Sequence, residues 1–137
     1  DYAQSDYVGG AILLGTAVDG SFVDADATNA KISLTIGSPG FYRAKFNFVV
    51  RMQASTLAVW LRLTDGTTPM KAIEAYETSV PGGINAFVNL SAIFNFTTSG
   101  SKTITLQKKV AEANTITLNQ ILSDAVDRAL HMELYKL

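Results

Sequence analysis

Apolar and polar residues alternate with a period of two along several stretches of the chain. The clearest stretch covers residues 41–52, where Tyr42 and Phe46 fall on one face and Arg43 and Lys45 fall on the other. A β-strand with one buried face produces this period, because successive side chains point to opposite sides of the sheet. We therefore predict a strand at 41–52. The same alternation predicts four more strands, at 31–36, 57–64, 86–96 and 103–107.

Weaker alternation predicts further strands at 8–14, 17–23, 70–76, 115–118 and 130–137. Short clusters of Gly, Pro, Asp and Ser separate these segments, and such residues supply the backbone angles that tight turns need. A parallel sheet buried on both faces would instead give continuous apolar runs. About nine or ten short alternating strands indicate an all-β fold, an antiparallel two-sheet sandwich or jelly roll.

One segment near the C-terminus has helical rather than strand spacing. Its apolar residues recur at intervals of three and four, namely Leu118, Ile121, Leu122, Ala125, Val126, Ala129 and Leu130. Neither Asn119 nor Ser123 is followed three residues later by the Glu or Gln of a capping box. We predict a short helical turn from Ser123 to Arg128 that leads into the last strand, with a longer helix as the alternative.

The composition is that of one domain that folds without metal or disulfide bonds. The 137 residues include no cysteine, which excludes disulfides and thiol catalysis, and the net charge of -1 argues against a nucleic-acid partner. No apolar run is long enough for a membrane-spanning helix. We expect one jelly-roll domain over residues 1–137, with residues 1–14 as an N-terminal arm. Because the chain begins at Asp1 rather than Met, we expect a processed chain or a fragment.

Candidate catalytic chemistry is sparse. His131 is the one histidine and lies near Glu133 in the predicted last strand. A hydrolase triad would also need an activated nucleophile, and no serine stands in a G-x-S-x-G turn. No glycine-rich segment precedes a helix in the way that a phosphate-binding loop does. We predict no catalytic residue, no cofactor and a surface or interface role for His131.

Asp19, Asp24, Asp26 and Asn29 are close enough in sequence to suggest several oxygen ligands for calcium. Their spacing does not match an EF-hand, because glycine follows the first Asp directly and no Glu closes the loop. Asp and Asn side chains also bond to nearby backbone in ordinary turns. We favour the turn and predict no metal site.

Several large apolar residues fall on the outward face of their predicted strands. Trp60 stands between inward-facing Val59 and Leu61, and Phe41, Phe87 and Ile93 also have outward parity. Exposed aromatic residues are enriched at the centres of protein interfaces. We predict a trimer or partner interface that includes Phe41, Trp60, Phe87, His131 and Tyr135. The alternative is that β-bulges invert the parity, or that some strands lie between two layers.

The order of the strands and the placement of aromatic residues resemble the C1q/TNF-like jelly roll. The resemblance spans roughly residues 31–137: the long aromatic strand from Gly40 to Phe48, the apolar strand 57–64 with its polar turn, the Thr-rich strand 103–106 and the terminal strand 132–137. It implies a compact homotrimer, with Trp60, Phe41 and Tyr135 packed about the threefold axis. The helical spacing near residues 123–128 departs from the family pattern.

C1q-like folds also occur in bacteriophage structural proteins, and the cysteine-free composition resembles those. The resemblance implies a non-enzymatic homotrimeric head-decoration or fibre module on the exterior of a virion, contacting capsid or fibre neighbours, with the arm at residues 1–14 reaching another subunit. The alternative is an extracellular receptor-binding or carbohydrate-binding module, in which Trp60 and Tyr76 stack on sugar rings and Asp19–Asn29 holds calcium. An enzyme is a residual third hypothesis.

Overall fold

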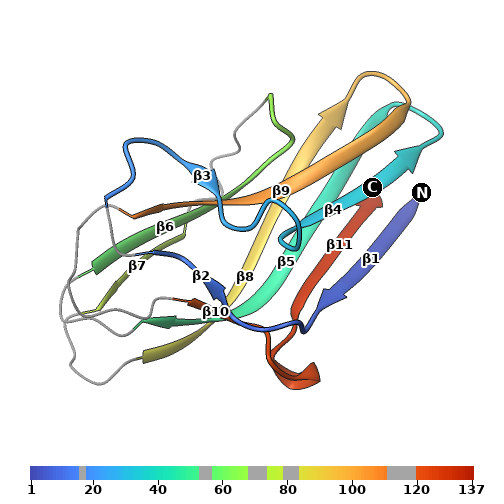
Figure 1. The fold of residues 1–137 in the computed structure, drawn as a ribbon. Helices are drawn as coiled ribbons and strands as arrows, with labels where there is room; N and C mark the ends of the chain where they lie inside the picture. Colours follow the sequence, from blue (N-terminus) through green and yellow to red (C-terminus); the bar gives the residue numbers. More distant parts are fainter. Residues whose placement is uncertain (16–17, 53–56, 68–73, 79–83, 111–119) are drawn as a thin grey trace.

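The computed structural model describes residues 1–15, 18–52, 57–67, 74–78, 84–110 and 120–137. Two antiparallel sheets stack face to face (Figure 1). Sheet A contains β1 (Tyr2–Tyr7), β2 (Ile12–Leu13), β5 (Gly40–Met52), β8 (Ile84–Phe96), β10 (Gln120–Leu122) and β11 (Leu130–Lys136). Sheet B contains β3 (Val23–Asp24), β4 (Lys31–Ile36), β6 (Leu57–Thr64), β7 (Glu74–Thr78) and β9 (Gly100–Val110).

The order of the strands is that of a jelly roll. In sheet A the longer strands run β1-β11-β5-β8, and in sheet B they run β4-β9-β6-β7. The chain crosses from one sheet to the other at most of its connections, which gives the two interlocked Greek keys of this fold. The predicted all-β sandwich is therefore confirmed. Kinship with the C1q/TNF family stays a prediction.

The core lies between the two sheets and is built from the inward residues of the alternating strands. These residues are fully buried on both sides of the sandwich, among them Tyr42, Phe46 and Met132 from sheet A and Leu61, Leu63, Ile104 and Leu106 from sheet B. Burial of one face is what produces the period of two in the sequence. The strands predicted at 31–36, 41–52, 57–64, 86–96, 103–107 and 130–137 all appear, several of them longer than expected.

The first fourteen residues belong to the sandwich, where the sequence suggested an arm reaching another subunit. β1 pairs with β11 of the same chain over six residues, from Tyr2 opposite Tyr135 to Tyr7 opposite Leu130. Ile12 and Leu14 are buried in the core. The segment gives a weak strand pattern because β1 is an edge strand that contains few apolar residues.

The C-terminal helical spacing yields one short turn, η1 (Val126–Arg128), a 3₁₀ helix. The predicted short turn is confirmed. The longer alternative does not form, because Ile121 and Leu122 lie in β10 and pair with Val50 and Val49 of β5. Of the weaker predictions, 8–14 contains β2, 17–23 ends in the first residue of β3, and 70–76 ends in the first three residues of β7. Residues 17, 70–73 and 115–118 lie outside the described residues. Within the described part of the chain, no helix is long and apolar enough to cross a membrane.

Replacing Phe46 by Ala should lower the free energy of unfolding by about 3–5 kcal/mol, because it removes a fully buried ring from a packed core. The adjacent Lys45 lies on the outer face, 4.0 Å from Glu133, so Lys45→Ala should change stability by less than about 1 kcal/mol. Urea denaturation followed by circular dichroism measures both values. Similar losses for the two variants would contradict the assignment of the faces of β5.

Candidate binding groove

A groove of about 720 Å³ lies on the outer face of sheet A. β8 and β5 form one side, β11 and β1 form the other, and the segment around η1 closes one end. The residues that line it are Gln4, Asp6, Val8, Asn47, Phe48, Val49, Phe87, Val88, Asn89, Val126, Asp127, Ala129 and His131. Four strands and the 3₁₀ turn that precedes β11 therefore meet at one concave surface.

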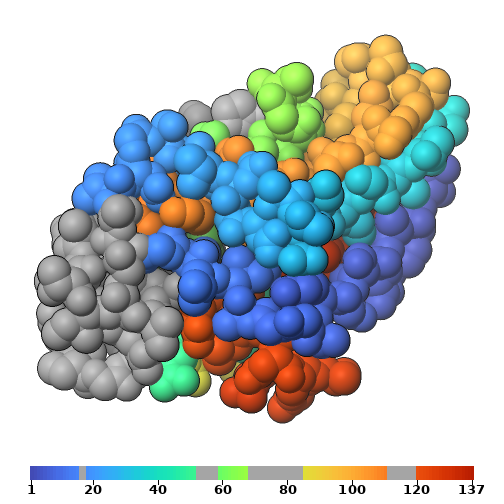
Figure 2. All heavy atoms as spheres, viewed as in Figure 1, coloured from blue at the N-terminus to red at the C-terminus, as the bar shows by residue number. Residues whose placement is uncertain are grey.

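The segment after β1 and the segment before η1 hold each other in place beside the groove, and they meet at the molecular surface (Figure 2). The Gly10 amide donates a hydrogen bond to the Ser123 carbonyl oxygen at 3.2 Å. In return, the fully buried Ser123 hydroxyl donates to the Gly10 carbonyl oxygen. These two hydrogen bonds connect the segment that contains Val126 and Asp127 to the segment that contains Val8.

A row of four polar side chains crosses the floor of the groove. Asn89 pairs in register with Asn47, Asn47 with His131, and His131 with Asp6. Residues directly opposite each other in a sheet point to the same face, so the four side chains stand in line across β8, β5, β11 and β1. Adjacent strands are about 4.8 Å apart, which makes the row about 14 Å long.

His131 is held between two carboxylates. Its Nδ1 lies 2.5 Å from Asp6 Oδ1, and its Nε2 lies 3.5 Å from Glu133 Oε1. An ionised carboxylate only accepts hydrogen bonds, so Nδ1 donates the proton. The hydrogen bond to Asp6 raises the pKa of His131 above its ordinary value of 6.5, against an opposing effect of partial burial. With both ring nitrogens facing carboxylates, the imidazole is fixed in orientation.

Asn47 contributes an unsatisfied acceptor to the row. Among the side chains that the structure describes, its Oδ1 atom is buried without a hydrogen-bond partner. Such an atom costs about 1–3 kcal/mol relative to one that has a hydrogen-bond partner.

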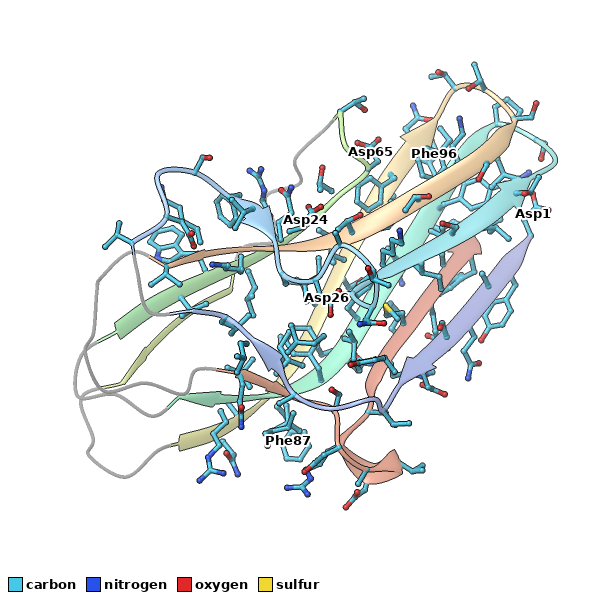
Figure 3. All side chains as sticks on the ribbon, in the orientation of Figure 1. Asp1, Asp24, Asp26, Asp65, Phe87 and Phe96 are labelled. Carbon is cyan, nitrogen blue, oxygen red and sulfur yellow. The ribbon has the colours of Figure 1, made fainter. Side chains whose placement is uncertain are left out.

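Beside the polar row stands an exposed apolar wall. Phe87 pairs in register with Val49 and is 87% exposed, and it projects away from the body of the sandwich (Figure 3). At the η1 end of the groove, Val126 is 89% exposed. Phe87 and Val126 are therefore two exposed apolar side chains in the lining of one groove.

The structure separates the five residues predicted for an interface. Phe87 and His131 line the groove, while Phe41 and Tyr135 lie on the same outer face of sheet A but outside it. Trp60 lies on the outer face of sheet B, 39% exposed, with its neighbours Val59 and Leu61 buried in the core. The two faces are separated by the thickness of the sandwich, so Trp60 does not join Phe41 and Tyr135 in one patch.

The outward parity assigned to these residues agrees with their exposure. Phe41 is 58% exposed, and Phe87, Ile93 and Trp60 are also exposed. The alternative, in which bulges invert the parity, does not apply to β5 and β8, because their register continues without interruption from Gly40 opposite Phe96 to Met52 opposite Ile84. The outward apolar residues are therefore true surface residues of this chain.

The carboxylates predicted as candidate calcium ligands each accept hydrogen bonds from different groups of the protein. Asp19 accepts hydrogen bonds from Lys108 Nζ at 2.8 Å and from the Val110 amide at 2.9 Å. Asp24 accepts one from Gln107. Asp26 accepts from the backbone amides of Thr28 and Asn29 and from the Asn29 side chain, which is the turn geometry favoured from the sequence. Neither Trp60 nor these carboxylates line the groove.

Sequence reasoning missed three of the four residues in the polar row. The period of two predicts only that Asn47 and Asn89 are outward polar residues of their strands. Asp6 lies in the segment that the sequence predicted to be an arm. Their juxtaposition depends on the pairing of β1 with β11 and of β5 with β8, over separations that no local pattern reports. The signal available in the sequence was the shared outward parity of Asn47, Asn89 and His131.

No family model matches the chain, and no curated protein matches it significantly. Among solved structures, the chain is similar to the native structure of a family 35 carbohydrate binding module from Clostridium thermocellum, with a TM-score of 0.43 and 13% sequence identity. The superposition covers 98% of this chain and 99% of that one.

The pKa of His131 should lie above 6.5 in the folded protein and fall towards 6.5 in Asp6→Asn, which removes the charged acceptor. NMR titration measures it directly, because the chain has one histidine. A raised folded pKa stabilises the protein fully below the unfolded value and loses this contribution as pH rises through the folded value. The stability difference between wild type and Asp6→Asn should therefore shrink as pH rises above about 6.5. An unchanged pKa in Asp6→Asn would contradict the assignment.

Proposed function

We propose that the protein is a non-enzymatic carbohydrate-binding module and that the groove on the outer face of sheet A is its sugar site. The observation that carries the proposal is the row Asn89, Asn47, His131 and Asp6, set beside the exposed ring of Phe87. Ligand sites combine apolar walls with a few placed polar groups, and this groove contains both.

The apolar and polar parts of the groove match the apolar face and the hydroxyl groups of a sugar ring. A pyranose presents an apolar face of C–H groups, which packs on an aromatic ring such as Phe87. Its edge presents hydroxyls that both donate and accept hydrogen bonds. The exposed amide of Asn89 offers both functions, and the exposed carboxylate of Asp6 accepts.

The size of the groove favours an oligosaccharide. The polar row is about 14 Å long, which exceeds one sugar ring, and it runs across the strands. The groove also extends past the row to Gln4 on one side and to Val126 on the other. A linear ligand laid along the row would contact all four strands.

The arrangement favours binding over catalysis. His131 faces Asp6 at one ring nitrogen and Glu133 at the other, so neither nitrogen is directed at a serine or threonine hydroxyl as a general base would be. Its fixed orientation instead holds the Asp6 carboxylate in place on the floor of the groove.

A glycan array followed by isothermal titration calorimetry tests the proposal. Phe87→Ala should weaken binding of the selected oligosaccharide at least about 10-fold, because it removes the stacking surface, a loss of about 1.4 kcal/mol or more. Phe41→Ala is the matched control: it removes an exposed phenyl ring from the same face but outside the groove, and it should leave affinity unchanged.

Asn47→Ala and Asn89→Ala should each weaken binding of the same oligosaccharide, while a chelator should leave binding unchanged, since the groove offers no cluster of carboxylates among its described residues. Silence across a broad array, or equal losses in Phe87→Ala and Phe41→Ala, would reject the sugar site.

The second candidate is the homotrimeric structural module on the exterior of a virion, contacting capsid or fibre neighbours. The observation in its favour is the aromatic group beyond the groove, where the rings of Tyr2 and Tyr135 lie 6.5 Å apart and Phe41 is exposed nearby on β5. Native mass spectrometry would show three chains, and Tyr135→Ala would release monomers. Trp60→Ala should leave such a trimer intact, since Trp60 lies on the opposite face of the sandwich.

A further inference from the structure

The edge of β8 is the longest exposed strand edge in the described part of the chain. β8 pairs with β5 through all thirteen of its residues. In the described part of the structure, no strand pairs with its other side. An unpaired edge presents a row of backbone donors and acceptors to any extended segment that approaches it.

β8 lacks the sequence features that usually prevent another strand from pairing with an exposed edge. The strand, Ile84–Phe96, contains no charged residue, no proline and no glycine, and its ladder with β5 has no bulge. Proteins usually protect exposed edges with these features. Two other edge strands of the sandwich contain charged residues, with Asp6 in β1 and Lys31 in β4, whereas β8 contains none.

The order of polar and apolar residues on the outward face of β8 is the same in both chain directions. Its outward residues in order are Asn85, Phe87, Asn89, Ser91, Ile93 and Asn95. The sequence of types is polar, apolar, polar, polar, apolar, polar, and it is symmetric about Leu90. Two antiparallel copies centred on Leu90 therefore match polar with polar and apolar with apolar at every outward position.

We propose that β8 pairs antiparallel with β8 of a second copy of this chain, about a twofold axis at Leu90, so that the two A sheets form one continuous sheet. In this register, Phe87 lies opposite Ile93 of the second copy, and Asn89 lies opposite Ser91. An aromatic residue opposite a β-branched one is a favourable cross-strand pair. The pairing sets the edge side of Phe87 against the second copy, leaves its groove side open, and is closed by the twofold symmetry.

The match is specific to this register. Moving the axis to Asn89 places Phe87 opposite Ser91 and Ile93 opposite Asn85. Moving it to Ser91 places Phe87 opposite Asn95 and Ile93 opposite Asn89. Either shift sets each apolar outward residue against a polar one. A shift by a single residue would turn the two outward faces to opposite sides of the joined sheet. The axis at Leu90 is thus selected by side-chain type.

Light scattering at micromolar concentration should give a mass of two chains. Ile93→Lys should raise the dimer dissociation constant at least about 100-fold, because it sets a charged group against Phe87 of the second copy. Ile93 does not line the groove, so the folded monomer of this variant should still bind the oligosaccharide selected for the groove. Phe41→Lys, on the same face but away from the edge, should remain dimeric.

Cysteine cross-linking tests the register directly, since the natural chain has no cysteine. A mixture of Asn89→Cys and Ser91→Cys proteins should form a disulfide-linked dimer on mild oxidation. A mixture of Asn89→Cys and Asn95→Cys proteins, whose sulfurs lie apart in this register, should not.

Several outcomes would overturn the proposal. They are a monomer at all concentrations, a dimer that survives Ile93→Lys and fails to cross-link, or a trimer that dissociates in Phe41→Lys. Each of these leaves sugar binding to be judged by its own titration, so failure of the dimer and failure of the sugar site are distinguishable.

Discussion

The pairing of β5 with three other strands holds this sandwich together. β5 pairs with β8 along its whole length, and on its other side with β11 and then β10. The inward residues of β5, from Tyr42 to Val50, are buried against sheet B. Because β5 lies at the centre of its sheet, its alternation fixes which residues of each neighbouring strand face the core and which face outward.

The groove is a consequence of that register. Asn47 lies on the outward face of β5 because Phe46 and Phe48 face the core, and pairing then places Asn89 on one side of it and His131 on the other. The pairing of β1 with β11 adds Asp6 to the line. A slip of one residue in any of these ladders would bury the polar row and expose core residues, so the stability of the core also maintains the site.

Exposed apolar side chains distinguish the outer face of sheet A. The chain is 47% hydrophobic and only 17% charged. Among the described residues, the most exposed aromatic side chain is that of Phe87, which lies where the groove meets the free edge of β8. This position allows Phe87 to contact both a sugar in the groove and a second copy of the chain at the edge of β8. One side of Phe87 borders Val49 and the groove, and the other side borders the open edge.

The sequence alone determined the fold class, most strand positions and the outward parity of Phe41, Trp60, Phe87 and Ile93, because a half-buried strand leaves its period in the chain. It also located the short turn near residues 123–128. It did not show that the first seven residues form a strand of the sheet, since an edge strand with few apolar residues leaves a weak pattern. The grouping of outward residues was decided by tertiary structure. Strand pairing over long separations placed Asp6 beside His131 and put Trp60 on the opposite face, and no local property of the sequence encodes that pairing.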